Sequence, residues 1–205
     1  MTKLRKKNKG MTLAETMVYA VLLGIVLTGI YGVFVSSMKY FRVGETRTVL
    51  HQNALLVMSK LCGDMAGTRG SSIIIETSQN PSGLIFVSAR NSNGNYEFDS
   101  DGQLKWQKWV CYYLKDIGNG RYDLMLKESY LTTPSSDPGV CPYTSVQQFA
   151  QSSLKDISVG RGMQSMTIVK ATDLQRYDFN LVFDQTTDTT KPNQLAVQTS
   201  IFVRN

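Results

Sequence analysis

A run of 23 residues without a charged side chain limits what this chain can fold into. The run occupies positions 16–38 and reads TMVYAVLLGIVLTGIYGVFVSSM. As an α-helix rising about 1.5 Å per residue it would be about 35 Å long, enough to cross a hydrocarbon core about 30 Å thick. Core helices of globular proteins are usually far shorter. The run therefore predicts a single membrane span.

The basic residues of the chain are concentrated ahead of this run. The net charge of +6 and the isoelectric point near 9.2 would suit a nucleic-acid-binding protein. Without the five basic residues before position 10, however, 17 basic side chains face 16 acidic ones. Such a leader is typical of a cytoplasmic anchor under the positive-inside rule, and no nucleic-acid partner is expected. The five are Lys3, Arg5, Lys6, Lys7 and Lys9.

A secretory signal peptide is the main alternative for the N-terminal segment. Its apolar region usually has about 7–15 residues and ends at a site of small residues. The present run is longer, although Val35-Ser36-Ser37 loosely imitates such a site. Cleavage near Ser37 therefore remains an alternative.

A lone carboxylate, Glu15, lies at the edge of the apolar run. A charge inside a transmembrane segment costs about 2.5–3.5 kcal/mol unless it is paired or near an interface. Cleavage after Gly10 would create a charged amino group on Met11, one helical turn from Glu15. Between parallel helices with an axial offset, the amine of one subunit could pair with Glu15 of another and fix their stagger. Alternatively, Glu15 only reaches the lipid headgroups.

The segment KKNKGMTLAE at positions 6–15, followed by the apolar run, resembles the class III signal of type IV prepilins and pseudopilins. The resemblance covers about residues 5–40. It implies that prepilin peptidase cuts between Gly10 and Met11 and methylates Met11, and that Glu15 guides assembly. Met11 stands where phenylalanine is usual, and Ala14 where a larger aliphatic residue is common.

An amphipathic helical pattern follows the apolar run over residues 39–66. Apolar residues recur there every three or four positions, which predicts one buried stripe on a helix continuous with the span. The stripe consists of Leu50, Ala54, Val57, Met58, Leu61, Cys62 and Met65.

After Gly70 the apolar period changes from about 3.6 to 2, which predicts antiparallel strands joined by short turns. We therefore expect an α+β fold, in which a long N-terminal helix packs on an antiparallel β-domain of two small sheets. The expected divisions are a leader (1–10), a transmembrane and assembly helix (11–38), an amphipathic half-helix (39–66) and a β-rich domain (70–205). Strands are expected at Ser72–Glu76, Leu84–Ala89, Asn95–Asp99, Leu104–Lys115, Arg121–Lys127, Met166–Ala171, Gln175–Phe183 and Leu195–Val203.

The three cysteines Cys62, Cys111 and Cys141 are too few for a disulfide scaffold and lack zinc-site spacing. If the β-rich domain lies outside the inner membrane, one disulfide with one thiol left over is plausible. Cys111–Cys141 is favoured because Cys62 lies on an apolar helical face, but the other pairings stay open. Cys141 belongs to Thr132–Ser153, an expected exposed loop that a disulfide would pin.

No enzyme, cofactor or metal site is expected. His51 is the sole histidine and lies in the amphipathic helix, without the setting of a catalytic triad.

The resemblance implies a membrane subunit with partners in prepilin peptidase, the inner-membrane assembly platform, other pilin-like subunits and, before assembly, membrane lipid. Its globular part would be periplasmic, and the subunit would end in a pilus or pseudopilus. The size of that part resembles larger minor pilins, which initiate or cap filaments, and the J-type pseudopilin of type II secretion. A signal-anchored periplasmic binding domain that never polymerises is the alternative from another class.

Overall fold

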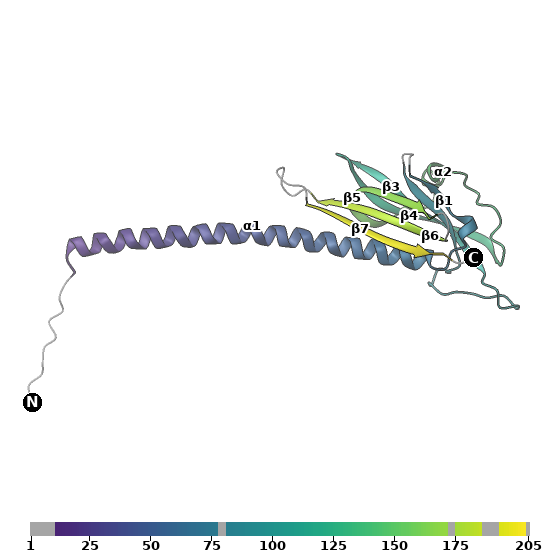
Figure 1. Ribbon diagram of the computed structural model, residues 1–205, viewed down its shortest axis with the longest axis horizontal. Coiled ribbons are helices and arrows are strands. Elements are labelled where there is room, and N and C mark those ends of the chain that lie inside the picture. The colour runs from purple at the N-terminus through teal and green to yellow at the C-terminus, as the bar shows by residue number, and fades with distance from the viewer. Residues whose placement is uncertain (1–10, 78–80, 172–174, 186–192, 204–205) are drawn as a thin grey trace, which may run out of the picture. The chain divides into compact units, whose positions relative to one another are not determined.

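The computed structural model describes residues 11–77, 81–171, 175–185 and 193–203 (Figure 1). Contacts within the chain divide it into two units, Met1–Glu45 and Thr46–Asn205. In chain order, the described elements are α1 (Leu13–Met65), a 3₁₀ turn η1 (Gly70–Ser72), β1 (Ile74–Glu76), β2 (Gly83–Ser88), β3 (Trp106–Gly118), β4 (Arg121–Ser135), α2 (Val146–Ala150), β5 (Ile157–Lys170), β6 (Arg176–Gln185) and β7 (Asn193–Phe202).

The first unit contains the N-terminal part of α1, which carries the uncharged run. Most of its large apolar side chains are exposed, among them Leu13, Leu23 and Phe34. Among the described residues, α1 is long and apolar enough to cross a membrane, judged by length and composition. This part of the helix has no packed core of its own, so its apolar surface is available to lipid or to other helices.

The second unit contains the C-terminal part of α1, and there the helix is amphipathic as predicted. The expected stripe is buried, with Val57, Leu61 and Met65 fully inaccessible and Cys62 half-buried at its edge. Leu55 and Leu56 point the other way and are exposed. The three- and four-residue spacing thus separates a face that packs on the sheet from a face that does not.

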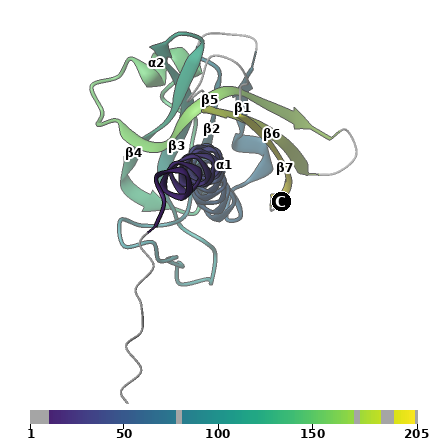
Figure 2. The ribbon, with the colours of Figure 1, turned by 90° about the vertical axis from the view of Figure 1, so that its left-hand side faces the viewer.

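The described strands form one antiparallel sheet of seven strands, in which each strand pairs with the next along the chain. A tight turn is enough to join antiparallel neighbours, as between β3 and β4, whereas longer segments join β2 to β3 and β4 to β5. The sheet curls over the second part of α1 (Figure 2). The predicted α+β fold, with one long helix and an antiparallel sheet, is confirmed.

The expectation of two small sheets is wrong, because β4 and β5 join the two halves. Tyr122 pairs with Met163, and Leu126 pairs with Ile157. The first half of β5 was not expected as a strand, since Gly160 and Gly162 interrupt its apolar alternation. Gly162 adopts a positive φ of 68°, and Gly160 lies against Val57 of α1, where a Cβ would clash. These glycines let the strand bend and approach the helix closely.

Alternating side chains give the sheet two separate cores. Phe86, Tyr112 and Leu124 face α1 and belong to the first core. Their neighbours on the same strands, such as Val87 and Cys111, point to the opposite face and belong to the second. β2 and most of β3 are buried without alternation because both of their faces are covered, whereas β5 buries only some of its side chains, on one face.

Two hydrogen bonds fasten the end of α1 to the sheet. The Tyr112 hydroxyl donates to an Asp64 carboxylate oxygen over 2.6 Å. The Thr68 hydroxyl donates to the Val87 carbonyl over 3.0 Å. Both donors are buried, so these bonds satisfy polar groups that would otherwise destabilise the first core.

The expected strand Asn95–Asp99 is not a strand in the structure. Two isolated bridges stand in its place, Arg90 with Tyr96 and Phe98 with Leu104. The side chain of Asn91 accepts hydrogen bonds from two backbone amides beyond it, and that of Asp99 does the same. Short polar side chains that bind nearby backbone amides compete with ladder formation.

The expected loop Thr132–Ser153 is only partly irregular. β4 continues to Ser135, and α2 forms at Val146–Ala150. Ser145 caps α2 by accepting a 3.1 Å hydrogen bond from the Gln148 amide. Val146 and Phe149 of α2 are buried against the second core, so this segment covers the sheet face opposite α1.

Candidate processing and assembly site

Glu15 lies in the first turn of α1 and closes a reciprocal pair of hydrogen bonds with Thr12. The Thr12 backbone amide donates to Glu15 Oε2 over 2.9 Å, and the Thr12 hydroxyl donates to the same oxygen over 3.1 Å. In return, the Glu15 amide donates to the Thr12 hydroxyl oxygen over 3.3 Å. This is a capping box, which satisfies amides that have no partner inside the helix. It also places a negative charge at the positive end of the helix dipole.

The two carboxylate oxygens of Glu15 differ in their surroundings. Oε2 accepts both bonds from Thr12, whereas Oε1 accepts none from a residue that the structure describes. Glu15 and its neighbours Met11 and Leu13 are exposed. The arrangement therefore holds one oxygen in place while the other can accept a hydrogen bond or ion pair from another molecule.

Of the other predicted processing residues, Gly10 lies outside the described residues. Met11 is described, is exposed, and directly precedes the capping residue Thr12. Thr12 itself was not singled out from the sequence. Its signal was present, since a threonine three residues before a glutamate and ahead of an apolar run is the pattern of a capping box.

The N-terminal segment matches a known family model, the prokaryotic N-terminal methylation motif, over residues 5–31. No curated protein and no solved structure matches the chain significantly. The motif is the prepilin-type class III signal, and the long helix α1 begins within it at Leu13. The motif and the helix therefore support a pilin-like prepilin, a substrate type of prepilin peptidase. Its apolar helix has the length and composition of a single-pass membrane anchor.

The three cysteines are free in the structure, and they occupy different environments. Cys62 is half-buried against the first core. Cys111 is fully buried in the second core, and Cys141 is half-buried against that same core. The favoured pair thus lies on one side of the sheet.

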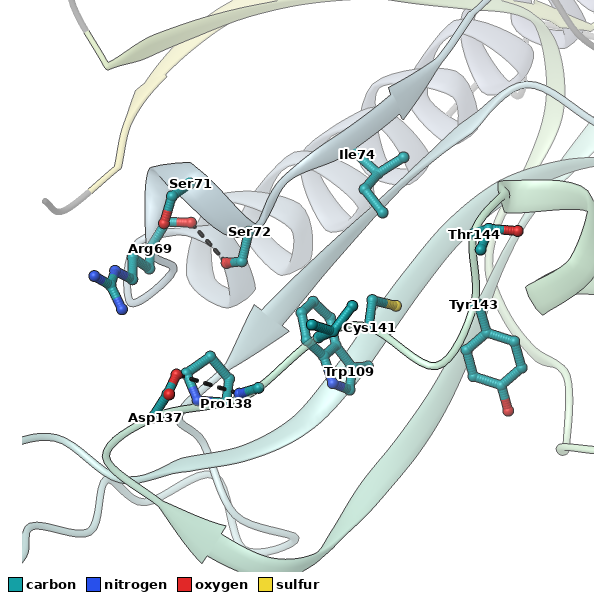
Figure 3. A pocket seen from close by; sticks show the side chains of 12 residues that line it. Arg69, Ser71, Ser72, Ile74, Trp109, Asp137, Pro138, Cys141, Tyr143 and Thr144 are labelled. Carbon is teal, nitrogen blue, oxygen red and sulfur yellow. Dashed lines mark hydrogen bonds between the residues drawn. The ribbon is translucent and has the colours of Figure 1, made fainter.

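A pocket of about 570 Å³ opens beside Cys141 (Figure 3). Arg69 just before η1, Ser72 of η1 and Ile74 of β1 line it, and the segment from Asp137 to Thr144 lines it from the other side. Trp109 also lines it, and this buried side chain has an indole N–H without a partner among the described residues. The pocket belongs to the face that α2 covers.

Chemistry of other kinds has little support among the described residues. They contain no group of three or more His, Cys, Asp and Glu side chains placed to hold a metal ion. His51 is exposed on α1. The features that point to a function are therefore the N-terminal motif and the apolar helix behind it.

Proposed function

We propose that this prepilin is cut between Gly10 and Met11, methylated on Met11, and built as a minor subunit into a type IV pilus-like filament. The observation that carries the proposal is the exposed Glu15 at the start of α1, inside the matched motif. An unpaired carboxylate at the edge of a membrane span is costly, and a partner in another subunit removes that cost.

Cleavage would give Glu15 such a partner. It creates a positively charged amine on Met11, next to the Thr12 that binds Glu15 Oε2. The amine of one subunit can then pair with the open Oε1 of a neighbour, with the two helices parallel and axially offset. A pair in low dielectric is strong only with well-placed hydrogen bonds, and the capping box supplies two of them. Thr12 would thereby act as a positioning residue for Glu15.

The leader charges give the proposed orientation. Five basic residues ahead of the span favour a cytoplasmic N-terminus, which places the sheet domain outside the inner membrane. The subunit would reside in the membrane before assembly, in contact with lipid, the peptidase and the assembly platform. A role in initiation or at the tip suits a subunit with a large seven-stranded domain in its described part. Service as a type II secretion pseudopilin is the alternative within this class.

The N-terminus of the mature protein tests the proposal. Intact-mass analysis of membrane-extracted protein from a peptidase-competent cell should give a chain that begins at methylated Met11. The same protein from a peptidase-deficient cell should keep residues 1–10. A mature N-terminus near Met38 would instead identify a secreted domain. An uncut leader in the competent cell would support the non-polymerising anchor.

A further inference from the structure

The sheet separates Cys62 from the other two cysteines. Val110 and Tyr112 belong to the core beneath α1, as does the half-buried Cys62. Cys111 lies between them on β3, so its side chain points to the other face and is buried in the second core. A bond between Cys62 and Cys111 would have to pass through the sheet. The same argument excludes Cys62–Cys141, because Cys141 also packs on the second core.

Cys111 and Cys141 share one environment. Cys111 belongs to the cluster that contains Trp109, Val146 and Phe149, and Cys141 packs against that cluster. Cys141 lies in the segment between β4 and α2. At the start of this segment the indole N–H of Trp106 on β3 donates to the Ser136 carbonyl over 3.1 Å, and at its end the Val146 amide donates to the Glu76 carboxylate over 2.9 Å. The Lys127 ammonium group donates to the Ala150 carbonyl over 2.6 Å at the C-terminal end of α2. The segment that carries Cys141 is thus held over the strand that carries Cys111.

The two thiols differ in accessibility. Burial raises the pKa of the Cys111 thiol strongly, and the neighbouring Cys141 raises this pKa further. Burial also raises the pKa of Cys141, but that side chain is half-buried and lines the open pocket. A soluble oxidant can therefore reach Cys141 first.

We propose that Cys111 and Cys141 form a disulfide outside the cytoplasm, which fastens the wall of the pocket to β3. The Cys141 thiolate attacks a protein or glutathione disulfide and expels one thiol. The Cys111 thiolate then attacks Cys141 Sγ in the mixed disulfide and expels the second thiol. Two protein thiols lose two protons and two electrons, and the oxidant's disulfide becomes two thiols. Formation in the cell rests on the extracytoplasmic location proposed above, whereas the choice of pair rests on the sheet alone.

The closed ring would contain residues 111–141, including the β3–β4 hairpin. It would limit the motion of the Asp137–Thr144 wall, which otherwise connects a strand to a short helix. The pocket would then keep one shape in the oxidised protein.

The test uses the full-length protein, purified in detergent and incubated with oxidised glutathione. Free thiols are counted with a mass-tagged maleimide after denaturation, and their number should fall from three to one. Trypsin should then release peptide 109–115 joined to peptide 128–155, with peptide 61–69 free and alkylated on Cys62. Cys62→Ala should crosslink like the parent, whereas Cys111→Ala should not form an internal disulfide.

Each outcome decides the pairing. A crosslink that includes peptide 61–69 overturns it, and so does a parent that keeps three free thiols while remaining folded by circular dichroism. A second count, on protein from cells lysed in acid with maleimide, tests the location separately. One free thiol in the cell supports both proposals. Three free thiols in the cell from a protein that crosslinks correctly in vitro would uphold the pairing and contradict the extracytoplasmic placement.

Discussion

Lys127 Nζ lies 3.3 Å from Asp156 Oδ1, and the lysine side chain is only 4% exposed. The same ammonium group donates to the carbonyls of Ala150 and Ser152 over 2.6 and 2.7 Å. One buried cation on β4 thus binds the end of α2 and the segment that leads into β5. A lysine is buried at little cost only when its donors are satisfied, and here three oxygens satisfy them.

Replacing Lys127 should destabilise the sheet domain far more than replacing a neighbouring lysine. Lys127→Met leaves two carbonyls without this donor, and we expect a loss of about 2–3 kcal/mol in the free energy of unfolding. Lys115 also binds Asp156, at 3.2 Å, but its side chain is 54% exposed. Lys115→Met should therefore cost less than about 1 kcal/mol. Urea unfolding of both variants measures the difference, and equal losses would show that Lys127 has no special role.

The Asp156 carboxylate should make stability fall in acid. Burial alone would raise the pKa of Asp156, but hydrogen bonds from Tyr113, Lys115 and Lys127 outweigh it and hold this pKa below its ordinary value of 3.8. A carboxylate with a lowered pKa stabilises the fold above its unfolded pKa, and this contribution is lost as the pH falls through the folded pKa.

The stability gap between the parent and Asp156→Asn should accordingly be full at neutral pH and shrink below about pH 4. Asp101→Asn is the matched control, because Asp101 is exposed on a turn and its side chain has no hydrogen bond or ion pair within the described residues. Urea titrations at a series of pH values check the prediction. A gap for Asp156→Asn that stays constant into acid would contradict it.

The buried stripe of α1 should be essential to the domain, whereas its outer face should not. Leu61 is inaccessible and Leu55 is 70% exposed on the same helix. Leu61→Ala should cost about 2–4 kcal/mol, because it removes buried surface and leaves a cavity. Leu55→Ala should change stability by less than about 0.5 kcal/mol. Both can be compared by denaturant unfolding of the detergent-solubilised chain; similar costs at the two positions would mean that α1 packs differently.

Glu15 should act in assembly and not in insertion. Glu15→Ala makes the span more apolar, so its level in the membrane should be equal or higher. Incorporation into sheared filaments should fall by about tenfold or more, since losing one partner of a buried pair costs about 3–5 kcal/mol. Glu15→Gln keeps shape and polarity without the charge, which separates an ionic role from hydrogen bonding.

The control for this experiment is Glu45→Gln, an exposed carboxylate on the same helix beyond the apolar run. It should assemble like the parent. If both Glu15 variants also assemble normally, Glu15 is an interfacial residue without an assembly role. If Glu15→Ala reaches the membrane but does not co-purify with other subunits, the non-polymerising anchor is excluded.

The periodicity of apolar residues in the sequence predicted the buried face of the helix and the positions of the most regular strands. The spacing of Leu50, Val57 and Leu61 placed the buried face of α1, and the alternation in β6 and β7 placed those strands. The number of sheets was mistaken because it depends on β5, whose Gly160 and Gly162 carry no apolar signal. The pairing of β4 with β5 also spans residues 136–156, and no local turn signal encodes it.

The sequence predicted the charged residue of the candidate site, Glu15, but not the hydrogen bonds that hold it. Glu15 stood out because its charge is costly beside an apolar run. The role of Thr12 became visible only through its contacts with Glu15. Likewise, the sequence left three cysteine pairings open, since the side of a sheet to which Cys62 and Cys141 belong depends on how distant segments pack.

For a domain exported as proposed above, the order of the strands has a consequence. Each strand pairs with the one before it, so the described sheet needs no long-range crossover. If the chain passes through a translocation channel from its N-terminal side, the helix emerges first. The strands then emerge one after another, and each can add to the edge of the sheet already formed. Each hairpin could close as it emerges, because local closure costs less entropy than pairing distant segments. A meander behind an anchored helix is thus suited to vectorial folding at a membrane surface, where a waiting, half-formed sheet would be prone to aggregate.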